Sequence, residues 1–206
     1  MTATADRRDG SGTARPVRLP PLPAALWDDE ARALFRGRLG PADKYLTGRP
    51  DAPPMPNVLG VLVHHRRLAG AWLAYNAALL QDGALAPWLR ELVVLRVAHR
   101  SGSRYEWLQH RRIGAEAGLT PQQLEAVTHG PDSAVWTPLE RLLLTATDEL
   151  LDGTVIRDDT WTALEQVLDT RQLLEVPFIV GTYLCLAMVF NSVALELDAD
   201  MQDPED

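Results

Sequence analysis

The amino-acid sequence predicts an all-α fold. Apolar residues recur at the three- and four-residue spacing of amphipathic helices through most of the chain. Two Thr-Pro pairs, at 120–121 and 137–138, each provide an N-cap residue followed by a proline at the first helical position. No hairpin dipeptide separates two alternating segments, and the β-branched run LVVL lies inside a helical period. We therefore expect helices and no strands.

The helices follow from these periods and from the residues that begin and end them. The segment 48–57 contains four prolines and is expected to be a loop, after which Asn57 can cap a helix. Ser103 and Glu106 have the spacing of a capping box, as do Thr137 and Glu140. The expected helices cover 24–38, 58–83 with a break allowed near His64 and His65, 87–102, 103–118, 120–130, 137–151, 158–169 with Asp158 or Asp159 as cap, and 171 onward.

The organisation predicted for the chain is one helical domain between two tails. Residues 1–23 are polar and proline-rich without apolar periodicity, so they form a disordered or surface-laid tail. Residues 24–198 form a single domain, and residues 199–206 form an acidic C-terminal tail. A chain of 206 residues can bury a sizeable core in this way.

Composition excludes several classes of function. The net charge of −8 argues against a nucleic-acid or anionic-membrane surface, since both need clustered Lys and Arg. A single cysteine, Cys185, excludes an internal disulfide framework and any CxxC centre, and it is interpreted as a small core hydrophobe. With no apolar signal segment near the N-terminus, we expect a cytoplasmic protein whose partners are a small-molecule substrate and further copies of itself. Arg-over-Lys and Ala-rich usage suggests a bacterial source.

One uncharged stretch, 176–195, has the length of a membrane span. It contains Pro177 and Gly181 together with several polar residues, and acidic rather than basic residues, Glu175 and Glu196, flank it. A buried core or interface helix is therefore the preferred interpretation.

Candidate catalytic residues lie between 90 and 110. On a helix that begins at Ser103, the side chains of Ser103, Glu106 and His110 share one face. A carboxylate near an imidazole raises its proton affinity and selects its tautomer, as a general base requires. The alternative is structural, with Glu106 only a capping residue and His110 a solvated neighbour.

Glu91 is a third candidate, because it lies among apolar residues of the preceding helix. A carboxyl group in such surroundings holds its proton more strongly than in water, or else it pairs with Arg90, Arg96 or His110. The alternative is an ion pair that serves only the fold.

The segment RELVVLRVAHRSGSRYEWLQHRRIGAEAGL resembles the signature of the carboxymuconolactone decarboxylase-like family, which includes the alkylhydroperoxidase D-like proteins. The resemblance extends over roughly residues 55–198 and implies an oligomeric alkylhydroperoxidase D-like helical bundle. The peroxidase branch has a glutamate, a CxxC pair and a histidine, which fall on Glu91, on Ser103 and Glu106, and on His110. Both cysteines are missing, so thiol peroxidase activity is not expected.

The resemblance implies acid/base chemistry without a metal or organic cofactor, on a lactone, β-keto acid or similar enolisable molecule. The reaction is a decarboxylation, isomerisation, elimination or cyclisation. In it, His110 moves the proton, Glu106 orients the His110 imidazole, and Glu91 is a second acid/base group or a structural anchor. Alternatives are a tailoring enzyme of small-molecule biosynthesis that uses the same site, and a ligand-binding protein without catalysis.

Further polar residues are expected to bind substrate. Ser103, Tyr183 or a backbone N–H can donate to a developing oxyanion, and His65 matches a histidine of the family. Adjacent histidines on a helix point about 100° apart, so His64 and His65 are not expected to hold one metal ion. Tyr75, Tyr183 and Asn191 complete the substrate-binding set, although a helix–helix hydrogen bond would equally explain Tyr183 or Asn191.

Overall fold

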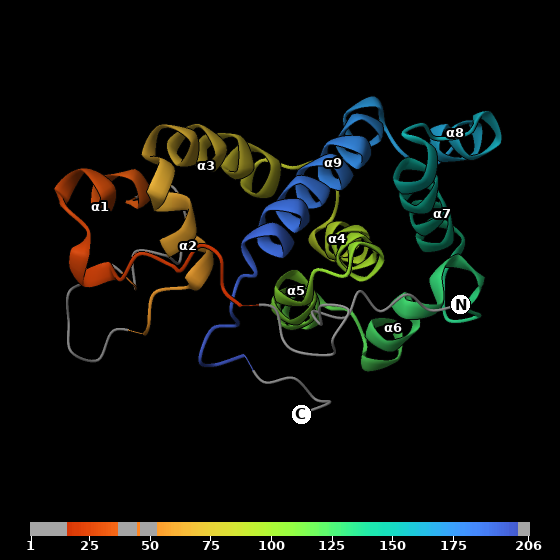
Figure 1. Ribbon diagram of the computed structural model, residues 1–206. Coiled ribbons are helices and arrows are strands. Elements are labelled where there is room, and N and C mark those ends of the chain that lie inside the picture. Colours follow the sequence, from red (N-terminus) through yellow and green to blue (C-terminus); the bar gives the residue numbers. More distant parts are fainter. Residues whose placement is uncertain (1–15, 37–44, 46–52, 202–206) are drawn as a thin grey trace. The chain divides into compact units, whose positions relative to one another are not determined.

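The computed structural model describes residues 16–36, 45 and 53–201, and every regular element in these ranges is helical, which confirms the all-α prediction (Figure 1). The described residues divide into two compact units, the first containing Gly83–Asn191 and the second the described residues of 15–82 together with 192–201. The helices centred in the first unit are α4 Pro87–Ser101, α5 Arg104–Ala117, α6 Pro121–Ala126, η4 Val127–Asp132, α7 Pro138–Gly153, α8 Asp158–Glu165 and α9 Thr170–Val193. The second unit holds η1 Ala24–Leu26, α1 Asp29–Phe35, α2 Asn57–Leu62, η3 Val63–His65 and α3 Arg66–Gln81.

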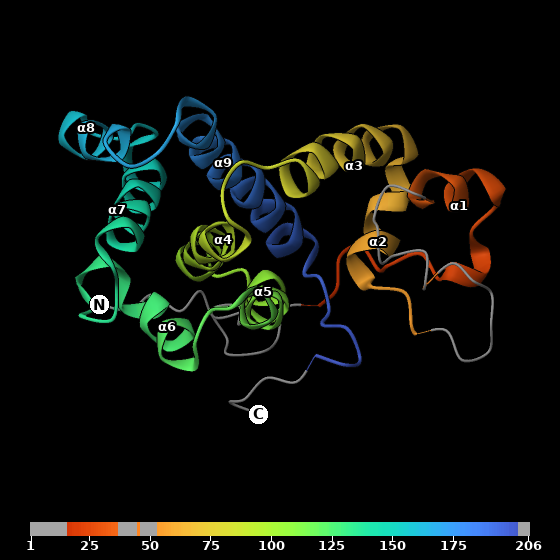
Figure 2. The same cartoon turned by 180° about the vertical axis from the view of Figure 1, so that it is seen from behind.

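Helix α4 is the centre of the first unit. It packs against α5, α7 and η4, and it lies beside α5 in both views of the ribbon (Figures 1 and 2). Because neighbours cover nearly all its sides, α4 is buried from Glu91 through Ala98. A helix that is enclosed in this way positions its polar side chains among apolar ones, where they need partners.

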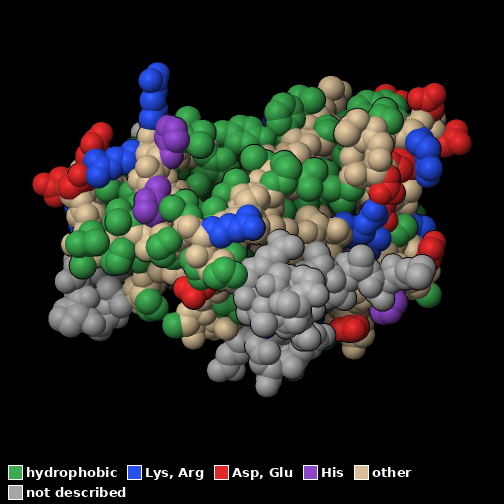
Figure 3. Space-filling model, in the orientation of Figure 1, with side chains coloured by type: hydrophobic (Ala, Val, Ile, Leu, Met, Phe, Trp, Pro, Cys, Tyr) green, Lys and Arg blue, Asp and Glu red, His purple; other side chains and the backbone are tan. Residues whose placement is uncertain are grey.

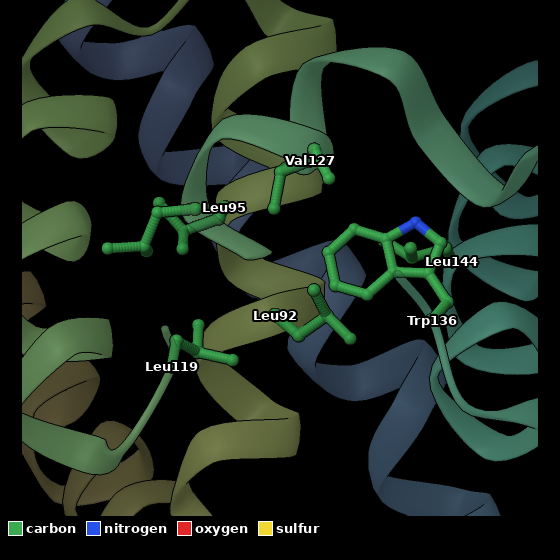
Figure 4. Close-up of a cluster of buried hydrophobic side chains, with 8 residues drawn as sticks. Leu92, Leu95, Leu119, Val127, Trp136 and Leu144 are labelled. Atoms are coloured by element: carbon green, nitrogen blue, oxygen red, sulfur yellow. The ribbon is translucent and has the colours of Figure 1, made fainter. Parts of the chain in front are cut away.

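A compact apolar cluster joins α4 to the elements that follow it (Figure 4). Leu92 and Leu95 of α4 meet Trp136 and Leu144, and all four are buried. The indole Nε1 of Trp136 donates to the carbonyl oxygen of Gly130 at 2.8 Å, so this large ring packs without leaving its polar atom unpaired.

Arg96 is the polar counterpart of this cluster. Its guanidinium donates to both carboxylate oxygens of Asp148, at 2.7 and 2.8 Å, and to the Val127 carbonyl at 2.8 Å. These contacts link α4 to α7 and to the first residue of η4. Arg96 is one of the three partners that the sequence offers to Glu91, and the structure assigns it to Asp148 instead.

Gly130 shows how closely η4 approaches this arginine. Its backbone has φ 74° and ψ −155°, a conformation that is open to glycine alone, and an added Cβ would lie 2.6 Å from the Arg96 Nη2.

We expect Gly130→Ala to lower the free energy of unfolding by about 1–3 kcal/mol, from backbone strain and steric overlap together. Urea unfolding followed by far-UV circular dichroism measures the change. Gly153→Ala, at a helical position with nothing within 4 Å, is the control and should be neutral or slightly stabilising; equal effects of the two substitutions would contradict this account.

Helix α9 buries one side and exposes the other. Ile179, Tyr183 and Phe190 are among its nine buried residues. By length and composition alone α9 could cross a membrane, and half of its most apolar window is buried within the protein.

Five exposed residues recur at steps of three or four along the side of α9 opposite to the buried one. We call this side the outer face of α9, and it consists of Leu174, Phe178, Gly181, Cys185 and Met188. Hydrophobic side chains gather over this part of the surface (Figure 3). The interpretation of Cys185 as a core residue is therefore wrong.

The second unit has its own small core. Trp27 and Phe35 stack with ring centroids 5.0 Å apart and pack with residues of α2, η3 and α3. Within the predicted N-terminal tail, residues 16–23 are described, and the Leu22 amide donates to the Gly60 carbonyl at 3.0 Å. The rest of the tail and most of the acidic C-terminal tail lie outside the described residues, and the predicted domain boundaries remain predictions.

Most helix limits follow their local signals, with three corrections. The predicted helix 24–38 is divided, because Trp27 is extended and Asp28 caps α1 by accepting from the Ala31 amide at 2.9 Å. Asn57 does not cap α2, since its side chain donates to the carbonyls of Glu196 and Leu197. Neither aspartate caps α8, which begins after Arg157. The break at His64 and His65, the start at Pro87 and the Thr-capped starts of α6 and α7 are confirmed.

Candidate active site

A tight turn places the candidate residues of α4 and α5 opposite one another. Gly102 ends α4 in the left-handed conformation at φ 63°, and its amide donates to the His99 carbonyl at 3.2 Å. The chain reverses there, and α5 begins at Arg104. Glu91, near the start of α4, therefore lies beside His110 in the second turn of α5, although 19 residues separate them.

His110 and Glu91 form a buried acid–imidazole pair. The Nδ1 atom of His110 lies 2.7 Å from Oε2 of Glu91, and Arg90 Nε donates to the other carboxylate oxygen at 3.3 Å. With the carboxylate accepting at Nδ1, the neutral ring carries its hydrogen there and its lone pair at Nε2. The Glu91 side chain is 2% exposed and that of His110 is 12% exposed, so the imidazole is the more exposed member of the pair.

The predicted partnership between Glu106 and His110 is wrong. They share a face of α5, as the spacing requires, but both Glu106 oxygens lack a hydrogen-bond partner among the described residues. His110 instead contacts Glu91 on α4, at 2.7 Å.

The predicted capping box at Ser103 is also wrong. Ser103 occupies the N-cap position of α5, yet its side chain accepts no bond from the first turn, and its Oγ has no hydrogen-bond partner within the described ranges. Both side chains are buried, Ser103 at 0% and Glu106 at 2% exposure. Two polar groups have thus been placed in the interior without the local bonds that would explain them.

Burial raises the pKa of Glu106 from its ordinary value of 4.5 to about 8, because removal from water disfavours the carboxylate. The nearby Ser103 hydroxyl opposes the shift, although the two side chains do not form a hydrogen bond of ordinary geometry. At neutral pH the group is therefore mostly a carboxylic acid, which can donate a hydrogen bond or a proton.

Tyr183, on α9, is a third member of the site, next to His110 and Glu91. Its ring meets the His110 imidazole edge-on, with centroids 4.9 Å apart and planes at 88°. Burial raises the pKa of the Tyr183 hydroxyl, and the Glu91 charge adds to the shift while Arg90 opposes it. The phenol is thus held neutral beside the imidazole, and the prediction that Tyr183 lies at the site is supported by this contact.

The remaining predicted residues have structural contacts of their own. Asn191 is exposed, and its Nδ2 donates to the Ser101 carbonyl at 3.0 Å, which is the helix–helix bond expected as its alternative role. His65 and Tyr75 belong to the second unit, where the His65 ring accepts from the Leu68 amide at 3.2 Å and caps α3 while Tyr75 is exposed. Their roles in substrate binding remain predictions.

Two further features lie apart from this group of residues. A surface hollow of about 550 Å³ is lined by residues of α6, η4 and the loop after it, and none of the predicted site residues lines it. Within the described ranges, no three or more His, Cys, Asp or Glu side chains are grouped closely enough to hold a metal ion. Trp107 packs against the apolar cluster, with the Arg111 guanidinium carbon 5.4 Å from the centre of its ring.

Comparison with known proteins identifies the class. Residues 66–149, which include Glu91, Ser103, Glu106 and His110, match the model of the Carboxymuconolactone decarboxylase family. A search of curated proteins found no match. Among solved structures, the alkylhydroperoxidase AhpD core of a peroxidase-related protein from Ralstonia eutropha JMP134 is similar at 22% identity and a TM-score of 0.73, covering 91% of this chain and 96% of that one.

Two other solved structures have the same fold. A peroxidase-related protein from Silicibacter sp. TM1040 is 16% identical with a TM-score of 0.73, covering 92% of this chain and 97% of that one. The debrominase Bmp8 is 13% identical with a TM-score of 0.70, covering 89% and 94%. The solved structures show that the fold is all-helical and AhpD-like. The match of residues 66–149 to the family model confirms the resemblance to the carboxymuconolactone decarboxylase-like family that was drawn from the sequence.

Proposed function

We propose that this protein is an acid/base enzyme that moves a proton at a carbon next to a carbonyl, in a lactone, β-keto acid or similar small molecule. The observation that carries the proposal is the 2.7 Å contact between His110 and the buried Glu91 carboxylate. Family membership and the fold it shares with an enzyme, the debrominase Bmp8, support a catalytic rather than a purely structural role.

In the proposed reaction, Nε2 of His110 takes the proton from carbon, and Glu91 stabilises the imidazolium that results. Arg90 donates to the second oxygen of Glu91 at 3.3 Å, which helps to keep the carboxylate in contact with the ring. The scheme uses side chains only and needs no metal or organic cofactor. Decarboxylation, isomerisation, elimination and cyclisation all pass through such an enolate or enol, and lyase or isomerase activity is the expected class.

A deuterium-incorporation assay tests this proposal for each of these reactions, because each passes through an enol or enolate that can take up deuterium at the α-carbon, whether a proton or CO₂ was lost to form it. The purified protein is incubated in D₂O with a panel of lactones and β-keto acids, and deuterium incorporation at the α-carbon is followed by proton NMR. We expect exchange above the buffer rate for at least one compound. No exchange with any member, together with saturable binding of one of them, would favour a ligand-binding protein over an enzyme.

Cys185 provides the control for thiol chemistry. It is exposed on the outer face of α9, and the chain has no second cysteine with which it can form an internal disulfide. The Cys185→Ser variant should therefore exchange protons at the wild-type rate in the same assay. A loss of activity in that variant would indicate that the Cys185 thiol takes part in the reaction.

We also propose that the protein self-associates through the outer face of α9, in a soluble and cytoplasmic form. This face is apolar and repeats at the three- and four-residue steps of a helix–helix seam, and no charge within 176–195 would repel an identical helix. In sedimentation experiments, we expect a wild-type oligomer that the double variant Leu174→Glu with Met188→Glu converts to a monomer. Val155→Glu, at a 62% exposed position outside α9, is the control, and a wild-type monomer would overturn the proposal.

A further inference from the structure

Three buried oxygens at the start of α5 have no hydrogen-bond partner in the part of the chain that the structure describes. They are Oγ of Ser103 and both carboxyl oxygens of Glu106. A buried polar group without a partner costs about 1–3 kcal/mol, and native structures seldom keep several together. Their accumulation on two side chains three residues apart indicates a place that accommodates something other than the protein itself.

The other buried glutamates show that Glu106 is an exception. Glu140 accepts from the Thr137 amide at 2.7 Å and from Gln123 at 2.5 Å, while Glu149 accepts from the Arg157 amide at 2.9 Å and from Thr160 at 2.8 Å. Glu91 is held by Arg90 and His110. Among the buried glutamates of the described residues, Glu106 alone has neither an ion pair nor a hydrogen bond.

The position of Glu106 connects it to the proposed base. His110 follows one helical turn later on the same face of α5, and the Tyr183 ring lies against that imidazole. The charged form of Glu106 acts on Tyr183, as does that of Glu91, so all three groups belong to one electrostatic environment. A carboxyl group that keeps its proton in these surroundings is a donor, whereas His110 is an acceptor.

We propose that Ser103 and Glu106 bind the carbonyl oxygen of the substrate, with Glu106 as the catalytic acid that complements His110. This inference rests on the proposed function for its chemistry. As His110 Nε2 takes the α-proton, the C–H electron pair forms the C=C bond of an enol. The carbonyl π pair moves to oxygen, which receives the Glu106 proton; Ser103 donates a hydrogen bond to the same oxygen.

The second half of the reaction restores both groups. The imidazolium returns its proton, or deuterium in D₂O, to carbon. The Glu106 carboxylate takes back the hydroxyl proton as the carbonyl forms again. Atoms and charges balance without a further reagent. A substrate of this site must therefore present an acceptor oxygen next to the carbon that loses its proton.

The proton on Glu106 can be observed directly. We would label the full-length protein with glutamate enriched in ¹³C at the side-chain carboxyl and record its carbon NMR spectrum across a pH series. The Glu106 signal is the one lost in Glu106→Gln, while Glu116→Gln, at an exposed position on the same helix, removes a different signal. The probes are γ-butyrolactone and acetoacetate, each titrated against the wild type and Ser103→Ala.

We expect the Glu106 signal to titrate near pH 8, and we expect at least one probe to shift it saturably at pH 7. Affinity for that probe should fall about 5- to 10-fold in Ser103→Ala, which corresponds to the loss of one hydrogen bond. In the exchange assay, Glu106→Gln should lower kcat more than it changes KM, and it should remove the decline in rate above pH 8.

Two results would overturn the inference: a Glu106 signal that titrates as an ordinary solvated carboxyl, or one that neither probe shifts. Both are read from the spectrum, so they are independent of turnover. Proton exchange that persists with either of these results would leave the proposed function standing without its acid. The expected spectrum with no exchange by any compound would reject the proposed function and retain the oxygen-binding site.

Discussion

Replacing His110 with alanine should reduce the rate of proton exchange by about 100- to 10,000-fold, the range typical of removing a general base. The imidazole is the group that takes the proton from carbon in the proposed scheme, and both carboxylate oxygens of Glu91 are already engaged, one by Arg90 and one by His110. The measurement is the rate of deuterium incorporation under saturating substrate, compared with the wild type after both have been shown to fold by circular dichroism.

Glu91→Gln tests the second member of the pair. The amide keeps the size of the carboxyl group but cannot stabilise an imidazolium, so we expect a loss in kcat with little change in KM. The control is His129→Ala, since His129 is an exposed histidine on η4 outside the site. If His110→Ala and Glu91→Gln both retained the wild-type rate, the pair would have no catalytic role.

The stability of the wild-type protein should fall as pH rises, and Glu106 should be the cause of part of that fall. In the folded protein its pKa is raised from 4.5 to about 8, so the folded state keeps a proton that the unfolded state has lost between these values. The contribution is fully present below pH 4.5 and is lost as pH rises through about 8. Across this window the slope contributed by one such group approaches about 1.4 kcal/mol per pH unit.

Urea unfolding of the wild type and Glu106→Gln at a series of pH values measures this effect as a difference. The variant cannot release a proton at this position, so its free energy of unfolding should depend less steeply on pH, and the two curves should separate between pH 4.5 and 8. Glu116→Gln should retain the wild-type slope. Parallel curves for the wild type and Glu106→Gln would show that Glu106 is not a buried acid.

Local signals predicted the helix starts well wherever a single residue and its near neighbours decide the backbone. The Thr137 side chain accepts a hydrogen bond from the Glu140 amide, and the Glu140 carboxylate accepts one from the Thr137 amide, as their spacing predicts. Thr120 and Gln123 form a second such box. Prolines at 87, 121 and 138 stand at first helical positions because that position requires no amide donor.

The same spacing misled at Ser103 and Glu106. A capping box requires the first turn of a helix to be free to bend its side chains back on itself, and here that turn is enclosed by neighbouring helices. Nothing in the sequence indicated that Cys185 lies on the exposed side of α9, because α9 is apolar on both sides and its periodicity does not distinguish them.

The sequence by itself determined the fold class, the resemblance to the family and the residues Glu91, Glu106 and His110 as candidates, because helical periodicity, caps and motif spacing are local properties of a chain. Only the tertiary structure decided which of them are partners. The turn at Gly102 sets α4 against α5, so His110 bonds to Glu91, 19 residues away, and Glu106 is left as a buried acid. Hydrogen bonding depends on distance and direction in space, and burial depends on every helix that packs around a side chain, so neither can be read from spacing along one helix.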